Sequence, residues 1–490
     1  VNDSRGTLYE RKGSDKMKLF TRPKCFSEAI ALMTSLNCLL GLRAFEYPRG
    51  YSRPILSLIY FLFICGLYSC SSLYLERKYN SNVALMKLEY ILYEVLMYVT
   101  IVSVILKMLL GWWHTKKFKV CYKKIFKIDE TLGQLGLSVN YNGIYFVTNG
   151  IIIMWITVFL IAIIISFPHL KKRVDTFTAI HMLLIYMYSL TVSGINVFEF
   201  YIFVKCLQMK FKLINQLLYE KLINLSTKEI KLGIFELKDY TKIMNVEQRK
   251  HIFLKNMIFQ LRQRKQSRMN VFVSEESQNR LASQIGTEFL PSQFKKQLQS
   301  KLRNRSRRHS ATMAKCQERK HLLQIIKQVH LELCKITKVV CTILGVQIAW
   351  EIGEIILILT GSLYYFYIRY ITQQYKVLIE QIILISALSF LSILKTIYLS
   401  YVCKNAANEA NKTIEIIHAI YGCDADTDMQ EEIQQFSIQI LQSPVTFFVF
   451  GVTLDNRILS SILKTVSTYI VIMIQMGHSL ESNNDVQLDI

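Results

Sequence analysis

The chain has 490 residues, of which 51% are hydrophobic and only 19% are charged. This balance falls outside the usual range of soluble globular domains and of disordered chains, and it favours a membrane protein. The formal net charge of +23 does not indicate nucleic acid as a partner, because the basic residues lack the interleaved aromatic side chains of a base-stacking surface.

Residues 1–53 form a basic N-terminal segment. No apolar stretch followed by a small-residue cleavage site occurs in it, so we expect no removable signal peptide. Residues 29–42 have the amphipathic pattern of a helix and are followed closely by Arg43 and Glu46. This pattern predicts a helix that lies at the membrane interface rather than one that crosses the membrane.

Seven apolar runs follow, each close to the length of about 20 residues that a helix needs to cross a hydrocarbon core. We therefore predict an all-α membrane protein with seven transmembrane helices: four within residues 54–204, two within 339–401 and the last at 458–476. The individual runs are 54–75, 88–113, 144–167, 177–204, 339–364, 377–401 and 458–476.

The orientation follows from Lys and Arg, which accumulate in cytosolic connections. Without the long fourth connection, the segments on the N-terminal side of the membrane carry 18 of these residues and those on the other side carry 8. We therefore expect a cytosolic N-terminus and an extracellular C-terminal tail, residues 477–490. A G-protein-coupled receptor has the opposite orientation, and the chain has neither Asp-Arg-Tyr after the third run nor Asn-Pro-x-x-Tyr in the seventh.

The long connection, residues 205–338, divides into three parts. Its flanks, 205–225 and 318–338, keep apolar residues at helical spacing and are expected to continue the fourth and fifth spans into the cytosol. Its middle, about 260–320, is polar and basic, which predicts a disordered linker near anionic lipid. A narrower hypothesis makes Ser310, which follows two arginines and a histidine, a kinase site.

The segment 402–457 is expected to be a cytosolic anchor. Residues 429–441 carry Ile433, Phe436 and Ile440 at helical spacing, which predicts an amphipathic helix. We expect a helical hairpin after it, which begins near Phe447 and turns at Asp455 before the last span.

The last span carries a polar stripe. Its members are four, three, four and three residues apart and therefore share one helix face. Hydroxyls on such a face either join helices within one bundle, or surround a water-filled axis between copies of the chain. In the second case Gln475 and Met476 narrow the outer end of the axis. The stripe consists of Ser461, Thr465, Thr468, Ile472 and Gln475.

The run from Thr468 and Tyr469 through five apolar residues to Gln475 resembles the C-terminal signature of insect gustatory receptors, Thr-Tyr, five hydrophobic residues, then Gln-Phe. The chain departs from that signature at Met476, where Phe is usual. Further similar elements, covering the last third of the chain, are Phe447, Phe448, Gly451, Leu454 and Asp455 before the signature, and His330, Leu333 and Cys334 in a His-x-x-Leu-Cys pattern.

This resemblance implies a ligand-gated, non-selective cation channel in the plasma membrane of a chemosensory neuron. It implies a homotetramer, or a heterotetramer with related receptors, in which the seventh span lines the pore and Gln475 and Met476 form the gate. The expected partners are a small-molecule tastant, membrane lipid and the permeating cations. The sugar-receptor branch often has an acidic residue after Thr-Tyr, and Ile470 stands here instead, so a sucrose-type ligand is disfavoured.

In that family the ligand is expected among spans two to six, in their outer halves. Candidates combine aromatic rings with a few polar groups. Carboxylates inside a span must find partners or water, so Glu351 and Glu354 either contact the ligand or pair with Lys107 or His181 for packing alone. The candidate residues are Tyr93, Glu94, His181, Tyr186, Trp350, Glu351, Glu354 and Gln381.

Other classes find little support in the sequence. The chain has no phosphate-binding Gly-rich loop, no His-Glu-x-x-His and no Gly-x-Ser-x-Gly, so we do not expect an enzyme. The 11 cysteines include no Cys-x-x-Cys, and we expect neither a metal nor a cofactor. A secondary transporter or a non-channel heptahelical receptor stays as the alternative, although the inverted repeats and broken helices of transporters are missing from the sequence.

Overall fold

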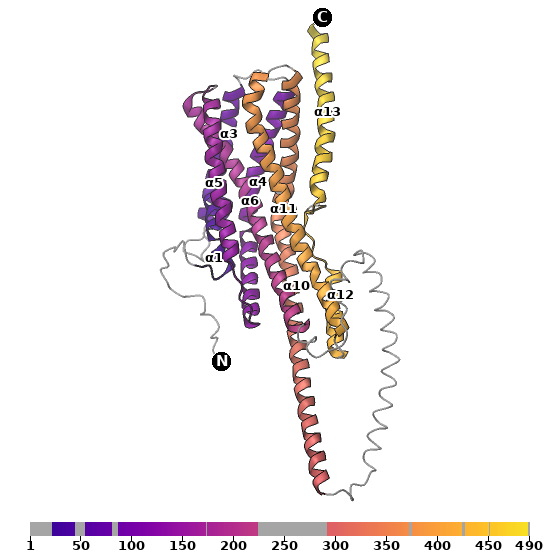
Figure 1. The fold of residues 1–490 in the computed structure, drawn as a ribbon. Coiled ribbons are helices and arrows are strands. Elements are labelled where there is room, and N and C mark those ends of the chain that lie inside the picture. Colours follow the sequence, from indigo (N-terminus) through magenta and orange to yellow (C-terminus); the bar gives the residue numbers. More distant parts are fainter. Residues whose placement is uncertain are drawn as a thin grey trace. The chain divides into compact units, whose positions relative to one another are not determined.

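The computed structural model describes residues 22–44, 54–80, 87–172, 174–223, 292–371, 375–423, 427–449 and 451–488 (Figure 1). Nearly all of them are helical, as the long apolar runs predict. The helices are α1 (Phe26–Ala29), α2 (Ala31–Leu39), α3 (Pro54–Asn80), α4 (Lys87–Gln134), α5 (Asn142–Lys171), α6 (Thr176–Leu218), η1 (Tyr219–Ile223), α10 (Ser292–Ile371), α11 (Tyr375–Cys423), α12 (Thr427–Gln442) and α13 (Arg457–Leu488).

Seven of the described helices, α3, α4, α5, α6, α10, α11 and α13, are long and apolar enough to span a membrane. Each contains one of the seven predicted runs, so the all-α, seven-span fold class is confirmed. The expected interfacial stretch forms the short helices α1 and α2, which are too short to cross a bilayer. The orientation of the termini stays a prediction.

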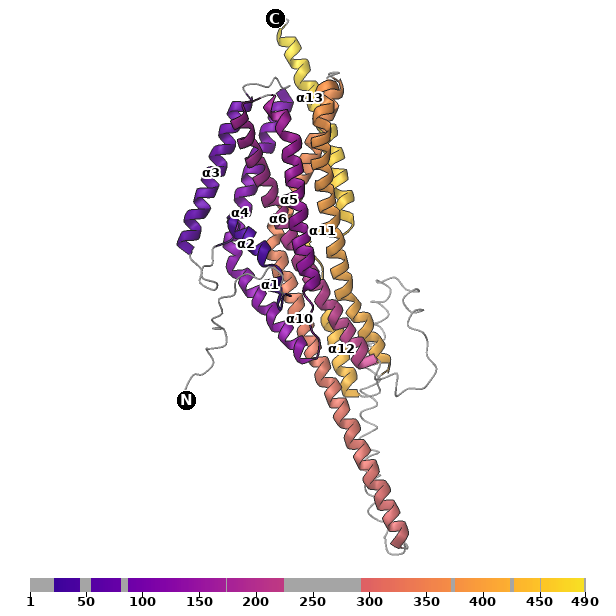
Figure 2. The same ribbon diagram turned by 60° about the vertical axis from the view of Figure 1, so that its left-hand side comes forward.

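The chain divides into two compact units. The first comprises Val1–Tyr219, Gln324–Ala419 and Ile433–Ile490. Within it, α6 packs against α3, α4 and α5, and these four helices are shown from two sides in Figures 1 and 2. Helix α6 forms the core of this group, because most of its apolar residues are buried, including Phe200, Phe203 and Phe211 at 0% exposure.

The second unit comprises Glu220–Leu323 and Ile420–Glu432. Its described residues include the first part of α10, which is helical from Ser292. The structure therefore differs from the expected disorder over 292–320, where Lys, Arg and Gln have good helix propensity and extend the apolar helix that follows. The stretch 224–291 lies outside the described residues, as does the side chain of Ser310.

The segment before α13 corrects one expectation. Helix α12 forms as predicted and buries Ile433, Phe436 and Ile440, but the hairpin after it is not helical. Strands β1 (Phe448–Val449) and β2 (Val452–Thr453) pair antiparallel. The turn between them contains Gly451 with a φ of +87°, a conformation that suits glycine and ends any helix.

Candidate functional site

Four charged side chains meet in the interior of the first unit. The Lys107 ammonium on α4 donates to Glu351 Oε2 at 2.7 Å and to Glu354 Oε2 at 3.1 Å, both on α10. The Lys395 ammonium on α11 donates to Glu351 Oε1 at 2.6 Å. Ser193 on α6 also donates to Glu351. The charged cluster therefore joins four helices that are far apart in the sequence.

The charged cluster is formally neutral, because two ammonium groups face two carboxylates. Lys107 is 1% exposed and Glu351 is 4% exposed, so neither charge reaches bulk water. An unpaired charge inside a span costs several kcal/mol, and removing one member of a buried pair leaves such a charge behind. Of the two partners weighed for the glutamates, Lys107 is the one that the structure places beside them.

A cavity of about 860 Å³ lies next to the charged cluster. Residues from α4, α5, α6, α10 and α11 line it, which are the second to sixth spans. Its wall is mostly aliphatic and aromatic, and Lys395 is the one charged residue among its described lining. The volume falls within the range of roughly 300–1,000 Å³ that is usual for small-molecule sites.

Two of the candidate ligand residues, Tyr93 and Tyr186, line this cavity. Glu351 and Glu354 lie behind its wall in the charged cluster. The other candidates do not line it. Glu94 and His181 are half-buried elsewhere, and Trp350 is half-buried with an indole N–H that finds no acceptor in the described part of the chain. The side chain of Gln381 lies outside the described residues.

Several lining residues were missed from the sequence. Trp155 on α5 packs against α6 at Gly194, where a methyl group would lie 3.3 Å from the indole ring. Tyr364, Tyr365 and Tyr398 look like ordinary apolar-run residues, and only their position marks them. Lys395 could have been found, because a lysine within an apolar run is as costly as the glutamates that were singled out.

Two further buried ion pairs lie in the same unit, nearer the connections. Arg43, which follows α2, pairs with Glu199 on α6 and lies 3.7 Å over the Phe118 ring. Burial disfavours its charge, but the adjacent Glu199 carboxylate raises the pKa of Arg43 above its ordinary value. Lys210 pairs with Asp129 and donates to Tyr141 at 2.8 Å. The first pair connects the end of α2 to α6, and the second connects α4 to α6.

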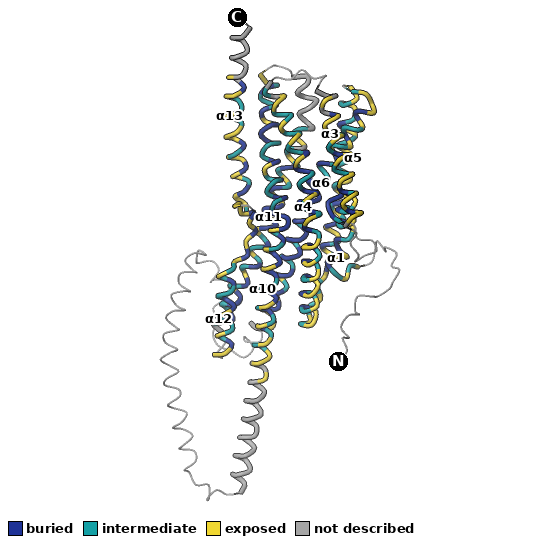
Figure 3. The backbone as a smooth tube through the Cα atoms, turned by 180° about the vertical axis from the view of Figure 1, so that it is seen from behind, coloured by how far each residue is buried: buried dark blue, intermediate teal, exposed yellow. Residues whose placement is uncertain are grey.

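Helix α13 contrasts with this interior. Its packed side consists of Ile458, Ile462 and Val466, each 3% exposed. At 3.6 residues per turn the centre of the polar stripe lies roughly 100° around the helix from the centre of that side. Figure 3 shows exposed positions repeating along α13. Four members of the stripe are exposed and Thr465 is half-buried, so no other helix of the described chain covers it.

The hydroxyls of α13 are partly satisfied by their own helix. Thr465 donates to the carbonyl of Ser461 at 2.9 Å, and Thr468 donates to the carbonyl of Lys464 at 3.0 Å. Their oxygens keep lone pairs that accept from water or from a partner. These two threonines are therefore compatible with both lipid and water.

The C-terminal end of the candidate span in α13 lies beside α4 and α10, two of the helices that line the cavity. A methyl group on Gly477 would lie 2.7 Å from the Tyr364 hydroxyl oxygen and 3.6 Å from a Leu88 methyl. Tyr364 is 1% exposed and also lines the cavity. The Tyr364 side chain therefore lies between the cavity and Gly477, the residue that follows Met476.

The motif residues that precede the stripe stabilise the fold around it. The Asp455 carboxylate accepts from the backbone N–H of Arg457 at 2.8 Å, which satisfies one free donor where α13 begins. Leu454 is buried and its N–H donates to the carbonyl of Phe447 at 2.9 Å, which closes the hairpin. His330 packs edge-on between Phe211 and Phe436 and contacts Cys334.

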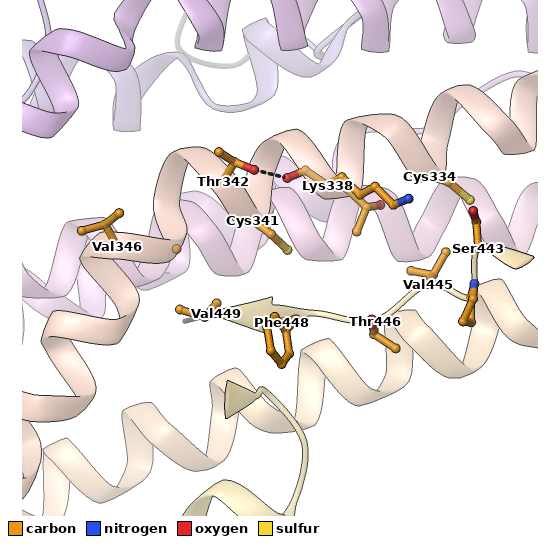
Figure 4. Close-up of a pocket in the computed structure, with 13 residues that line it drawn as sticks. Cys334, Lys338, Cys341, Thr342, Val346, Ser443, Val445, Thr446, Phe448 and Val449 are labelled. Carbon is orange, nitrogen blue, oxygen red and sulfur yellow. Dashed lines mark hydrogen bonds between the residues drawn. The ribbon is translucent and has the colours of Figure 1, made fainter. Parts of the chain in front are cut away.

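A second cavity of about 590 Å³ separates α10 from the segment that leads to the hairpin. Figure 4 shows Cys334, Cys341 and Val346 on α10 facing Val445 and Phe448 across it. Two of the motif residues, Cys334 and Phe448, line this cavity, together with Lys338 and several Ser and Thr side chains. Among the described residues, no group of His, Cys, Asp or Glu is placed to hold a metal ion.

One family model matches most of the chain. The model is described as 7tm Chemosensory receptor and matches residues 33–252 and 288–478. These ranges include the cavity, the charged cluster, the hairpin and the polar stripe. No curated protein matches the chain.

Proposed function

Because the chain belongs to the 7tm chemosensory receptor family, we propose that it is a gustatory receptor subunit that acts as a ligand-gated, non-selective cation channel. The channel opens when a small organic tastant binds in the cavity formed by spans two to six. Four subunits, identical or from related receptors, surround the pore in the plasma membrane of a chemosensory neuron.

The exposed polar stripe of α13 carries this proposal. A spanning helix of one chain ordinarily turns its polar side towards its own bundle, but α13 packs through Ile458, Ile462 and Val466 and turns the stripe away. Copies of the chain arranged around one axis would bring their stripes together and provide a path for ions. Gln475 and Met476 are exposed near the C-terminal end of the candidate span Arg457–Gly477, where they would narrow that path.

The position of Tyr364 supports the coupling between ligand and gate. Tyr364 lines the cavity, and its hydroxyl group lies close to Gly477. A ligand that moves this ring changes the space available to the end of α13. The proposal assigns no direct ligand contact to Glu351 or Glu354, since both are held in the charged cluster.

Whole-cell recording from cells that express the full chain tests the proposal, with a panel of small organic compounds applied in turn. We expect a ligand-evoked current whose reversal potential follows the cation gradient and is unchanged when chloride is replaced. Native mass spectrometry of the purified protein should give a tetramer. Ligand-coupled uptake without a channel-sized current would identify a transporter instead.

A further inference from the structure

The cavity wall carries one charge whose surroundings limit the chemistry of the ligand. Lys395 is 17% exposed by its side chain and lines the cavity beside Tyr398 and Leu399. An ammonium group has three N–H donors. Two are used, one by Glu351 Oε1 at 2.6 Å and one by Ser193 Oγ at 3.3 Å. The third donor has no acceptor among the described residues, so it is available to a molecule in the cavity.

The charged cluster also determines which net charge the cavity accepts. The carboxylate of Glu351 already balances Lys395, and the whole cluster sums to zero. An anion beside Lys395 would meet the nearby Glu351 carboxylate, and a cation would meet the ammonium with no acidic residue among the described lining. Both would also lose their hydration in an apolar cavity, which is costly.

The rest of the cavity wall limits the number of polar groups that a ligand can carry. The lining consists mainly of aliphatic side chains and of aromatic rings such as Trp155, Phe159 and Tyr201. A sugar carries many hydroxyls, and each one without a partner costs free energy on burial. Flat aromatic rings on several helices instead favour a ligand with its own ring.

We propose that the cavity binds a neutral, lipophilic aromatic molecule with a hydrogen-bond acceptor such as a carbonyl or ether oxygen, and that Lys395 determines this preference by donating its third N–H to that acceptor. The assignment names the ligand class of the proposed receptor and rests on that function. It concerns binding, so it can be tested without any current.

The test measures binding to the purified full chain in detergent by the shift of its thermal unfolding midpoint. The probes are shape-matched sets built on several aromatic scaffolds. One set is 4-ethylacetophenone, the hydrocarbon 1-ethyl-4-isopropylbenzene, the anion 4-ethylbenzoate and the cation (4-ethylphenyl)trimethylammonium. Sucrose and fructose are added to the panel. Ketones and ethers should bind at least tenfold more tightly than the charged members and the sugars.

Variants assign the preference to the residue. Lys395→Met should weaken ketone binding about tenfold, which corresponds to roughly 1.4 kcal/mol, and should change hydrocarbon binding less than twofold. Lys404→Met on the same helix, at an exposed position outside the cavity lining, should change neither. If Lys395→Met misfolds, the double variant Lys395→Met with Glu354→Gln is used in its place, because its charged cluster is again neutral.

The inference is overturned by tightest binding of a charged member or a sugar, by absence of binding for every neutral acceptor up to its solubility limit, or by equal loss of ketone and hydrocarbon binding in Lys395→Met. Current recordings on the same compounds separate the two proposals. Ketone binding without any current would leave the ligand class standing and would contradict the channel.

Discussion

In the most apolar window of α6, 72% of the residues are buried, whereas in α13 the share is 17%. Both helices carry polar groups across the membrane. On α6, Glu199 and Ser193 contact charged residues of other elements. On α13, Thr465 and Thr468 donate to carbonyl groups of the same helix and lie on a face that no described helix covers. The first arrangement fixes a scaffold within one chain, and the second leaves a face of α13 exposed, where the proposed channel requires other copies to meet.

The comparison predicts that small changes in the scaffold unfold it. Gly111→Ala on α4 should have the largest effect, because its methyl group would lie 2.1 Å from the carbonyl oxygen of Leu42. Backbone cannot move aside as a side chain does, so we expect a loss of about 3 kcal/mol or more. The measurement is the folded fraction after gel filtration. Gly133→Ala on the same helix meets nothing within 4 Å and should behave like the parent; equal folding of both variants would contradict tight packing here.

Loss of one charge from the charged cluster should have the next largest effect on stability. Lys107→Met leaves Glu354 with Ser103 alone and Glu351 with Lys395 and Ser193. We expect a destabilisation of about 3–5 kcal/mol, as for other broken buried pairs, seen as a lower thermal unfolding midpoint. Lys464→Met makes the same change at an exposed position of α13 and should leave the midpoint nearly unchanged. Similar shifts in both variants would erase the contrast between the two regions.

On α13 the expected changes concern current rather than stability. Met476→Ala should increase the current without ligand several-fold, because a smaller side chain weakens an apolar constriction. Leu463→Ala removes a side chain of equal exposure, 51% in both cases, from the other side of the helix, and should leave the basal current as it is. An unchanged basal current in Met476→Ala would remove the gate from this position.

The smallest effect should appear where the two regions meet. Gly477→Ala places a methyl group 2.7 Å from the Tyr364 hydroxyl oxygen and should shift the half-activating ligand concentration a few-fold. Tyr364→Phe removes that oxygen, so adding it to Gly477→Ala should restore the parent value. If the shift persists in the double variant, the two residues do not couple the cavity to α13.

The sequence predicts α13 and its polar stripe better than it predicts the cavity in the scaffold. The spans, the amphipathic α12 and the stripe on α13 follow from periodicity, because each pattern is local in the chain. The hairpin at Gly451 was expected to be helical, since aromatic residues and valines do not distinguish a two-residue strand from a helix end. The cavity wall was predicted only at Tyr93 and Tyr186. Its other members come together through helix packing, which no single sequence displays.

Access to water along α13 tests the central claim most directly. In cells expressing the full chain, a charged methanethiosulfonate reagent should reduce the ligand-evoked current of Thr468→Cys by more than half and leave the parent chain and Leu463→Cys unaffected. That result would place the stripe beside the ion path. Full current in modified Thr468→Cys, with block of Leu463→Cys instead, would show that ions pass elsewhere and would contradict the account.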